Sequence, residues 1–220
     1  MRLVAAIISV LVFLIVKKIK KGPVTGFDVA LIIFGVCLSM IIIFTQVISL
    51  YTAPTKSMFP TIKPGDCFVE LLCRYGLRVP FTTRWLYRIK PKRGDVITFY
   101  IPEAFVSQWR WWRKERTKRI VGMPEDEIMM KNGKVYINGI TLYEPYAVYI
   151  GPSKSYAKST FTKKDNWDKP IKVPKGEYFV MGDNRNNSED SRHFGFVPLD
   201  YITGKVVFII WPPHRIGLIY

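Results

Sequence analysis

Two residues of this sequence, Ser57 and Lys118, have side chains suited to attack on a carbonyl group. A serine hydroxyl becomes a useful nucleophile when a neighbouring base accepts its proton. A lysine amine can be that base only while it is neutral, and burial in apolar surroundings lowers a lysine pKa by up to several units. The pair therefore predicts an acyl-transfer site if the fold buries Lys118 beside Ser57.

The residues that follow Lys118 are consistent with such burial. Lys118 and Arg119 precede two apolar residues, Ile120 and Val121. Because neighbouring side chains of a strand point to opposite faces, Lys118 can face the core with Ile120 while Arg119 faces outward. A Lys-Arg pair on a solvated surface is the ordinary alternative.

His193 is a second candidate base. With Ser57 and Asp190 it would supply the three groups of a catalytic triad, and the closeness of Asp190 and His193 in sequence lets one loop carry both. Replacing His193 separates the two hypotheses, because a Ser57–Lys118 dyad tolerates the change and a triad does not.

The element ahead of Ser57 is a long apolar segment. Residues 29–51 contain no charged side chain, and a helix of that length spans the roughly 30 Å hydrocarbon core of a bilayer. Residues 3–16 are apolar but form a shorter segment, which predicts a short first span or an interfacial helix, with a secretory signal peptide as the alternative. A lysine cluster, and no small-residue cleavage site, follows that first segment.

The lysine cluster, residues 17–21 (KKIKK), predicts the orientation of the chain. Clustered lysines in a short loop stay on the cytoplasmic side of a membrane. Residues 1–51 are therefore predicted to be a membrane anchor that carries residues 52–220 to the extracytoplasmic side. The net charge of +16 does not oppose this, since long domains translocate largely regardless of charge, and it favours anionic lipid as a partner.

Residues 52–220 are predicted to fold mainly as β-strands. Runs at residues 65–76 and 93–102 are rich in β-forming residues and contain Gly-Asp turns, and residues 204–213 form a late apolar strand. Residues 127–139 (EIMMKNGKVYING) predict a hairpin with a type I′ turn at Asn132-Gly133, followed by a second Asn-Gly turn. We expect a smaller β insert at about residues 125–178, with a long loop at 151–170.

Two further features concern the surface and the redox state. Residues 105–119 interleave tryptophans with arginines, a composition that suits the lipid headgroup layer, a partly buried edge strand, or single-stranded nucleic acid. The extracytoplasmic position argues against nucleic acid.

Cys67 and Cys73 lie in what is predicted to be one strand, which would place their Cα atoms roughly 20 Å apart, so both thiols are expected to be free.

Four separated blocks give the chain a specific resemblance. They are residues 57–61 (SMFPT), 93–99 (RGDVITF), 118–126 (KRIVGMPED) and 182–197 (GDNRNNSEDSRHFGFV). In this order, behind an apolar segment, they resemble the bacterial type I signal peptidases of the S26 type, which are membrane-bound Ser/Lys leader peptidases. The resemblance implies an antiparallel β catalytic domain behind two N-terminal transmembrane helices.

The resemblance also implies roles for the matching positions. Ser57 matches the nucleophile and Lys118 the general base, and Thr55 with the Ser57 backbone N–H matches the oxyanion hole. Ser188 matches the hydroxyl that orients the lysine amine. The positions that match site-shaping residues are Met58, Pro60, Gly182 and Asn184, and those that match ion-pairing residues are Arg119, Asp183, Asp190 and Arg192. Lys56 and Asn186 depart from the family's usual small and acidic residues.

The implied function is removal of signal peptides from exported preproteins, through an acyl-enzyme and without metal or cofactor. The implied location is the bacterial inner membrane, as a multi-pass protein with its catalytic domain outside the cytoplasm and the secretion translocon nearby. Three alternatives stay open: a dedicated pro-protein peptidase of a conjugation or pilus system, a self-cleaving repressor with the same Ser/Lys chemistry, and a non-catalytic domain that binds lipid. The repressor conflicts with the apolar segments and with the lack of DNA-binding helices in the sequence. The non-catalytic domain conflicts with the intact Ser57, Lys118 and Ser188.

Overall fold

The computed structural model describes residues 47–78, 85–101, 115–150 and 169–220, together with parts of the segment 25–37. The chain divides into two compact units: residues 1–49 with 72–89, and residues 50–71 with 90–220. Residues 3–16, the lysine cluster at 17–21, most of the tryptophan-rich segment 105–119 and most of the loop 151–170 lie outside the described residues. The predictions made for them stay predictions.

Within the described part of the chain, no helix is long and apolar enough to cross a membrane. Described residues between 26 and 37 are helical, but strand β1 (Ile48–Thr52) begins inside the segment predicted as a transmembrane helix. The predicted span over residues 29–51 is therefore wrong at its C-terminal end. An apolar run does not by itself distinguish a helix from a strand, and here its last residues join a sheet next to β2.

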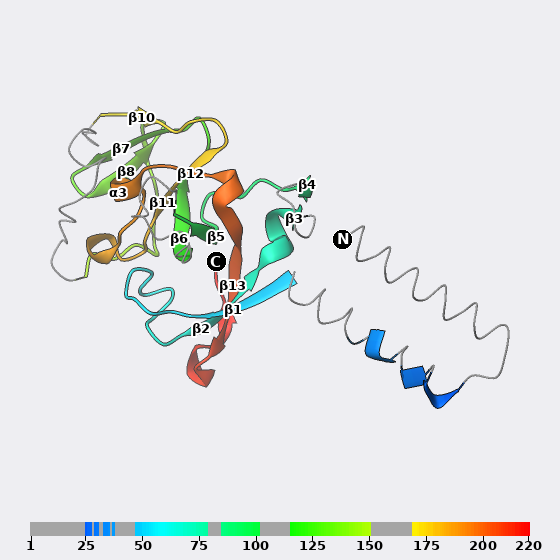
Figure 1. The fold of residues 1–220 in the computed structure, drawn as a ribbon. Helices are drawn as coiled ribbons and strands as arrows, with labels where there is room; N and C mark the ends of the chain where they lie inside the picture. Colours follow the sequence, from blue (N-terminus) through cyan, green and yellow to red (C-terminus); the bar gives the residue numbers. More distant parts are fainter. Residues whose placement is uncertain are drawn as a thin grey trace, which may run out of the picture. The chain divides into compact units, whose positions relative to one another are not determined.

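One eight-stranded sheet carries most of the second unit (Figure 1). Its strands, in spatial order, are β1, β2 (Cys67–Leu71), β13 (Ile202–Trp211), β5 (Val96–Tyr100), β6 (Glu115–Gly122), β11 (Glu177–Met181) and β12 (Val197–Pro198), with β14 (Gly217–Leu218) paired to β13. The registered pairs β2–β13, β13–β5, β5–β6 and β6–β11 are all antiparallel. The mainly antiparallel β fold predicted from the sequence is confirmed.

The remaining elements are short. A four-stranded sheet has the order β10 (Ile171–Lys172), β7 (Glu127–Lys131), β8 (Lys134–Ile137) and β9 (Ile140–Thr141), and the first unit holds the pair β3 (Gly76–Arg78) and β4 (Trp85–Arg88). The described helical turns after β1 are η1 (Leu72–Tyr75), η3 (Arg185–Asn187), α3 (Ser191–Phe194), η4 (Leu199–Tyr201) and η5 (Pro213–Arg215). They connect strands, and η3 and α3 bring the last sequence block to the end of β11.

The β7–β8 hairpin has the predicted turn. Asn132 and Gly133 both have positive φ, at 51° and 73°, and Lys131 pairs with Lys134 across them. Positive φ at both central residues defines the type I′ turn, which asparagine and glycine adopt at little cost. Asn138 and Gly139 repeat the pattern between β8 and β9, with φ of 52° and 80°.

The run at residues 65–76 is only partly a strand. β2 ends at Leu71, and η1 contains Cys73, so the single strand predicted to hold both cysteines is wrong. Cys67 and Cys73 nevertheless carry free thiols, as does Cys37.

Two apolar clusters lie beside β6, the strand that carries Lys118, and beside the strands next to it. One joins residues of β2, β5 and β13 to Ala53, Met58 and Ile62 of the loop after β1. The other joins β6 and β11 to the four-stranded sheet through Val121, Phe179 and others. β6 therefore changes along its length: Glu115, Arg116 and Thr117 are partly exposed, and every residue from Lys118 to Gly122 is buried.

Candidate active site

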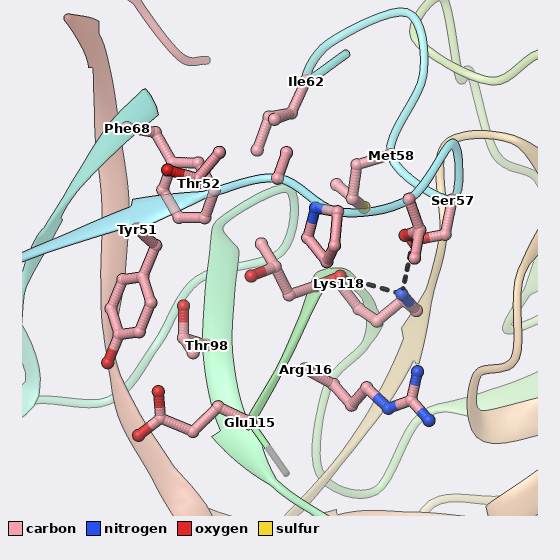
Figure 2. A pocket seen from close by; sticks show the side chains of 14 residues that line it. Tyr51, Thr52, Ser57, Met58, Ile62, Phe68, Thr98, Glu115, Arg116 and Lys118 are labelled. Atoms are coloured by element: carbon pink, nitrogen blue, oxygen red, sulfur yellow. Dashed lines mark hydrogen bonds between the residues drawn. The ribbon is translucent and has the colours of Figure 1, made fainter. Parts of the chain in front are cut away.

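Ser57 and Lys118 meet although 61 residues separate them in the sequence. The Lys118 Nζ lies 2.9 Å from Ser57 Oγ and 2.9 Å from the carbonyl oxygen of Thr117, and it donates to both (Figure 2). Ser57 comes from the loop after β1, and Lys118 comes from the point where β6 enters the interior. The contact is the one that a serine nucleophile and its base require.

Lys118 is only 3% exposed. Burial lowers its pKa from 10.5 to about 8, and the charge of Arg116 lowers it further, whereas the charges of Asp190, Glu189 and Asp183 act in the opposite direction. A substantial fraction of this amine is therefore neutral near pH 8, as a general base must be.

The loop that holds Ser57 is fixed at both ends by main-chain hydrogen bonds. Ile62 N donates to Met58 O, Phe59 N donates to Lys56 O, and Met58 itself is 4% exposed. Pro60 follows a cis peptide bond in this loop. Met58 and Pro60 therefore lie where the predicted shaping residues were expected, next to the nucleophile.

The last sequence block supports Ser57 from the other side through Asn184, whose backbone N–H donates to Ser57 O at 3.1 Å. Gly182 lies against the same carbonyl: a Cβ at position 182 would stand 2.5 Å from Ser57 O and 2.2 Å from Ser188 Oγ. Only a glycine fits there, because real Cβ atoms do not approach other atoms so closely.

Ser188 differs from the prediction. Its side chain is buried beside Gly182 and the main chain of Ser57, but its Oγ has no hydrogen-bond partner among the described residues. The predicted hydrogen bond from Ser188 to the lysine amine is absent in this structure, because Lys118 Nζ instead donates to Ser57 and to the carbonyl of Thr117.

Thr55 lies next to the nucleophile, with its Oγ1 3.2 Å from Ser57 Oγ. The side chain of Thr55 is exposed toward the space in front of Ser57. A hydroxyl in this position is available to a developing oxyanion on a bound carbonyl, together with the Ser57 backbone N–H.

Arg119 and Asp183 form a buried, bidentate ion pair. Arg119 Nε and Nη2 donate to the two Asp183 carboxylate oxygens at 2.9 and 2.8 Å, and both residues are at most 2% exposed. Arg119 Nη1 also donates to the carbonyl oxygens of Gly94 and Tyr220, and the guanidinium lies 4.1 Å from the ring centre of Tyr146. The expectation that Arg119 faces outward is wrong, because both faces of β6 are covered at this point.

Asp190 and Arg192 form a second bidentate pair at the start of α3. Arg192 Nε and Nη2 each donate to Asp190 at 2.8 Å, and the Asp190 carboxylate also accepts from Gly182 N. Burial disfavours the charged carboxylate, but the Arg192 charge and these hydrogen bonds hold the pKa of Asp190 well below its usual range. Asp190 therefore ties α3 to the Gly182 turn.

His193 takes part in the capping box of α3. Asp190 N donates to His193 Nδ1 at 3.3 Å, and the Asp190 side chain accepts from the backbone of the first turn. His193 Nδ1 also lies 3.8 Å from Asp190 Oδ1, but the side-chain contacts of Ser57 Oγ are with Lys118 Nζ and Thr55 Oγ1. The geometry supports Lys118 as the partner of Ser57.

Sequence reasoning missed a segment that braces the site. Arg185 donates to Glu144, Val148 N donates to Asp183 O, and Arg185 N donates to Val148 O. The residues near 144–148 have no motif, and their link to the site is Arg185 of the last sequence block, a charged side chain that is only 4% exposed and therefore needs a partner.

A cleft of about 210 Å³ begins at Ser57 and runs away from it along β6 (Figure 2). Its lining includes four apolar side chains, Ala53, Met58, Ile62 and Phe68, of which Met58 lies next to the nucleophile and Phe68 stacks on Tyr51. A second cavity of about 290 Å³ lies against Ser57 and is polar, with Lys56, Asn187 and Glu189 in its lining. Lys56 therefore lies beside the nucleophile and is exposed to this cavity.

The cleft follows an unpaired strand edge. β5 pairs with β6 from Glu115 to Arg119, but on the other edge β11 pairs with β6 only from Arg119 onward. The edge from Glu115 to Lys118 carries no strand partner among the described residues, and all four residues line the cleft. An extended peptide can add to such an edge through main-chain hydrogen bonds.

Comparison with known proteins agrees with this arrangement. The family model described as signal peptidase, peptidase S26, matches residues 26–211. The chain is 32% identical over 191 residues to signal peptidase IB of Staphylococcus aureus, which covers 82% of this chain and 88% of that protein. It is 34% identical over 166 residues to the probable signal peptidase I-2 of a Synechocystis species, in an alignment that covers 76% of this chain and 64% of that protein.

A crystal structure of a signal peptidase I from Enterococcus faecalis aligns with 53% of this chain and 97% of its own, at 32% identity and a TM-score of 0.37. The family-model match covers most of the sequence, and it includes all four blocks on which the resemblance was based. The chain therefore belongs to the signal peptidase I family of serine endopeptidases, peptidase S26.

Proposed function

We propose that this protein removes N-terminal signal peptides from exported preproteins, with Ser57 as the nucleophile and Lys118 as the general base. The observation that carries the proposal is the 2.9 Å contact between Ser57 Oγ and the buried Nζ of Lys118. The burial that lowers the lysine pKa to about 8 supports the same assignment.

In the acylation step, neutral Lys118 accepts the proton of Ser57 while Oγ bonds to the carbonyl carbon of the scissile peptide. The C–N bond then breaks, Lys118 returns the proton to the leaving amine, and an ester to Ser57 remains. In the second step Lys118 accepts a proton from water, whose oxygen bonds to the ester carbonyl carbon. The bond to Ser57 Oγ then breaks, Lys118 returns the proton to Oγ, and the signal peptide is released.

Thr55 Oγ1 and the Ser57 backbone N–H are proposed as the donors that stabilise the oxyanion in both steps. A donor of this kind contributes about 3 kcal/mol to the transition state. Ser188 is proposed to accept an N–H of neutral Lys118, which leaves the amine lone pair free for the Ser57 proton, since its buried hydroxyl lies beside the Ser57 main chain and has no partner among the described residues.

The substrate is proposed to bind as an added strand along the edge from Glu115 to Lys118. The apolar wall of Ala53, Met58 and Phe68 suits small apolar residues just before the scissile bond. Membrane anchoring by apolar residues ahead of β1, in the bacterial inner membrane, is part of the proposal. Tyr51, which ends the apolar segment, lines the far end of the cleft, so the cleft would lie near the lipid surface where signal peptides emerge. Anionic lipid and the secretion translocon are its proposed neighbours.

The test is cleavage of a preprotein with an Ala-x-Ala site, in detergent, by the wild type and by Ser57→Ala, Lys118→Ala and His193→Ala. Loss of at least about 10³-fold in the first two variants, with substantial activity in the third, is the expected result. Cleavage that survives Lys118→Ala but not His193→Ala would replace the dyad with a triad. A wild type that does not cut this substrate would refute the proposed activity.

A further inference from the structure

The cleft beside Ser57 is not apolar along its whole length. At the end away from the nucleophile its lining changes to Tyr51, Thr98 and Glu115, whose side chains gather on one side of the pocket in Figure 2. The small apolar residues that the proposed function places next to the scissile bond would leave this end unused. The polar lining of this end indicates which kind of substrate side chain would bind there.

Thr98 presents an unsatisfied hydroxyl to the cleft. The residue is 2% exposed, and its Oγ1 has no hydrogen-bond partner within the described parts of the chain. A buried polar atom without a partner is unfavourable by roughly 1–3 kcal/mol. A ligand group that hydrogen-bonds to Thr98 would recover this free energy, so the hydroxyl marks the place of a polar group from outside.

Glu70 lies on β2, the strand beyond β13, and it also has a polar atom without a partner. Glu70 is fully buried, and its Oε2 has no hydrogen-bond partner among the residues described. Thr203 Oγ1 lies 2.7 Å from Glu70 Oε1 and 2.9 Å from the carbonyl oxygen of Thr98, but its single proton can serve only one of them at a time. Tyr51 also hydrogen-bonds to Glu70, so its hydroxyl is already engaged at this end of the cleft.

Glu115 gives the end of the cleft its charge. It is partly exposed and forms no ion pair with any cation in the described segments, whereas the next residue, Arg116, pairs with Glu189 at 3.1 Å. Neighbouring strand residues point to opposite sides, and Figure 2 shows Glu115 and Arg116 diverging in this way. Burial raises the pKa of Glu70 to about 7, against the hydrogen bond from Thr203, and the Glu115 charge adds to the rise, so the two carboxylates act on each other.

The position of Glu115 along the strand defines the substrate residue concerned. Glu115 lies three residues before Lys118 on the unpaired edge of β6, which corresponds to about 10 Å of extended chain. The residue just before the scissile bond lies at Ser57 and Lys118. The fourth residue before that bond therefore lies opposite Glu115. Only a long side chain there would extend back to Thr98, whose partner on β6 is Thr117.

We propose that Tyr51, Thr98 and Glu115 form a subsite for a lysine side chain at the fourth position before the cleaved bond, an inference that rests on the proposed function. An ammonium group brings three donors and no acceptor. It therefore supplies a hydrogen bond for Thr98 and a positive charge for Glu115, neither of which has such a partner within the described residues.

The test uses two preproteins that differ only at this position, one with lysine and one with methionine, and the full-length enzyme in detergent. Wild type is expected to cut the lysine substrate with kcat/KM about tenfold higher, since one charge-assisted hydrogen bond contributes on the order of a tenfold difference. Glu115→Gln is expected to remove most of this preference, and Thr98→Val to reduce it. Glu125→Gln is the matched control: Glu125 is exposed in a turn outside the cleft, and this variant should keep the preference.

Equal rates on the two substrates with wild type would overturn the subsite and leave the proposed function standing. A lysine preference that survives Glu115→Gln would also overturn the subsite. So would a preference that Glu125→Gln reduces as much as Glu115→Gln does, since it would then come from the net electrostatic field of the domain. If neither substrate is cut, the proposed function fails and the subsite fails with it.

Discussion

A Cβ atom on Gly182 would stand 2.5 Å from the carbonyl oxygen of Ser57. The turn after β11 thus touches the main chain of the nucleophile directly, and the adjacent Asn184 N–H donates to the same oxygen. The contact fixes how far Ser57 stands from β6, which carries Lys118.

Gly182→Ala is expected to lower cleavage by at least about tenfold and stability by roughly 1–3 kcal/mol, because the added methyl group must push Ser57 or Ser188 away. Cleavage kinetics and urea unfolding measure the two effects. Gly217→Ala is the control, since the nearest atom to its Cβ is 3.9 Å away. Unchanged cleavage by Gly182→Ala would show that the contact does not position Ser57.

The pH profile reports the ionisation of Lys118. Its pKa of about 8 means that the amine is protonated and inactive at low pH, so kcat/KM should rise as pH increases through about 8 and level off above it. A profile that is flat from pH 6 to 10 would contradict Lys118 as the base.

Two charge variants should move this profile in opposite directions. Arg116 lowers the pKa of Lys118 and Glu189 raises it, so Arg116→Gln should shift the rise in activity to higher pH and Glu189→Gln to lower pH, each by a fraction of a unit. A shift of both variants in the same direction would show that another group titrates.

The Arg119–Asp183 pair is expected to be essential for stability. Arg119→Met leaves the Asp183 carboxylate buried without its partner, which typically lowers stability by about 3–5 kcal/mol. Urea unfolding measures this loss. The exposed pair Lys175–Glu125, at 3.8 Å, is the comparison: Glu125→Gln should change stability by less than about 1 kcal/mol. Similar losses in both variants would refute the special role of the buried pair.

Glu70 is expected to make stability depend on pH. Burial raises its pKa from 4.5 in the unfolded chain to about 7, so the folded protein holds this proton more tightly, and stability falls as pH rises from about 4.5 to about 7. The loss is roughly 3 kcal/mol, from 1.36 kcal/mol per pKa unit. Glu70→Gln should remove it, as urea unfolding at pH 5 and pH 8 would show. An unchanged pH dependence in Glu70→Gln would mean that other groups cause it.

Local patterns predicted those parts of the fold that local physics determines. The Asn132-Gly133 turn follows from the backbone freedom of two residues, and the strand at β5 follows from a run of β-forming side chains between turns. The end of the apolar segment at β1 was mispredicted because pairing with β2 decides between helix and strand, and that partner lies elsewhere in the chain.

The site residues were predictable only as separate blocks. Strand alternation correctly separated Lys118 from Arg119, but it gave no sign that Asp183 and Tyr146 would cover the outer face and bury the arginine. Glu70 lies in none of the four blocks, and the block at residues 93–99 predicted no role for Thr98. Their importance arises because β13 lies between β2 and β5, a neighbourhood that no single segment of the sequence contains.

The short unpaired edge of β6 also has a consequence for inhibition. In the described part of β6, the four residues from Glu115 to Lys118 are open, so a compound that imitates a strand of four residues would match this edge. With an amine at one end for Glu115 and an electrophilic carbon at the other for Ser57, such a mimic would engage both ends of the cleft at once. Methylation of its central amide nitrogens would remove the main-chain donors and should abolish its binding.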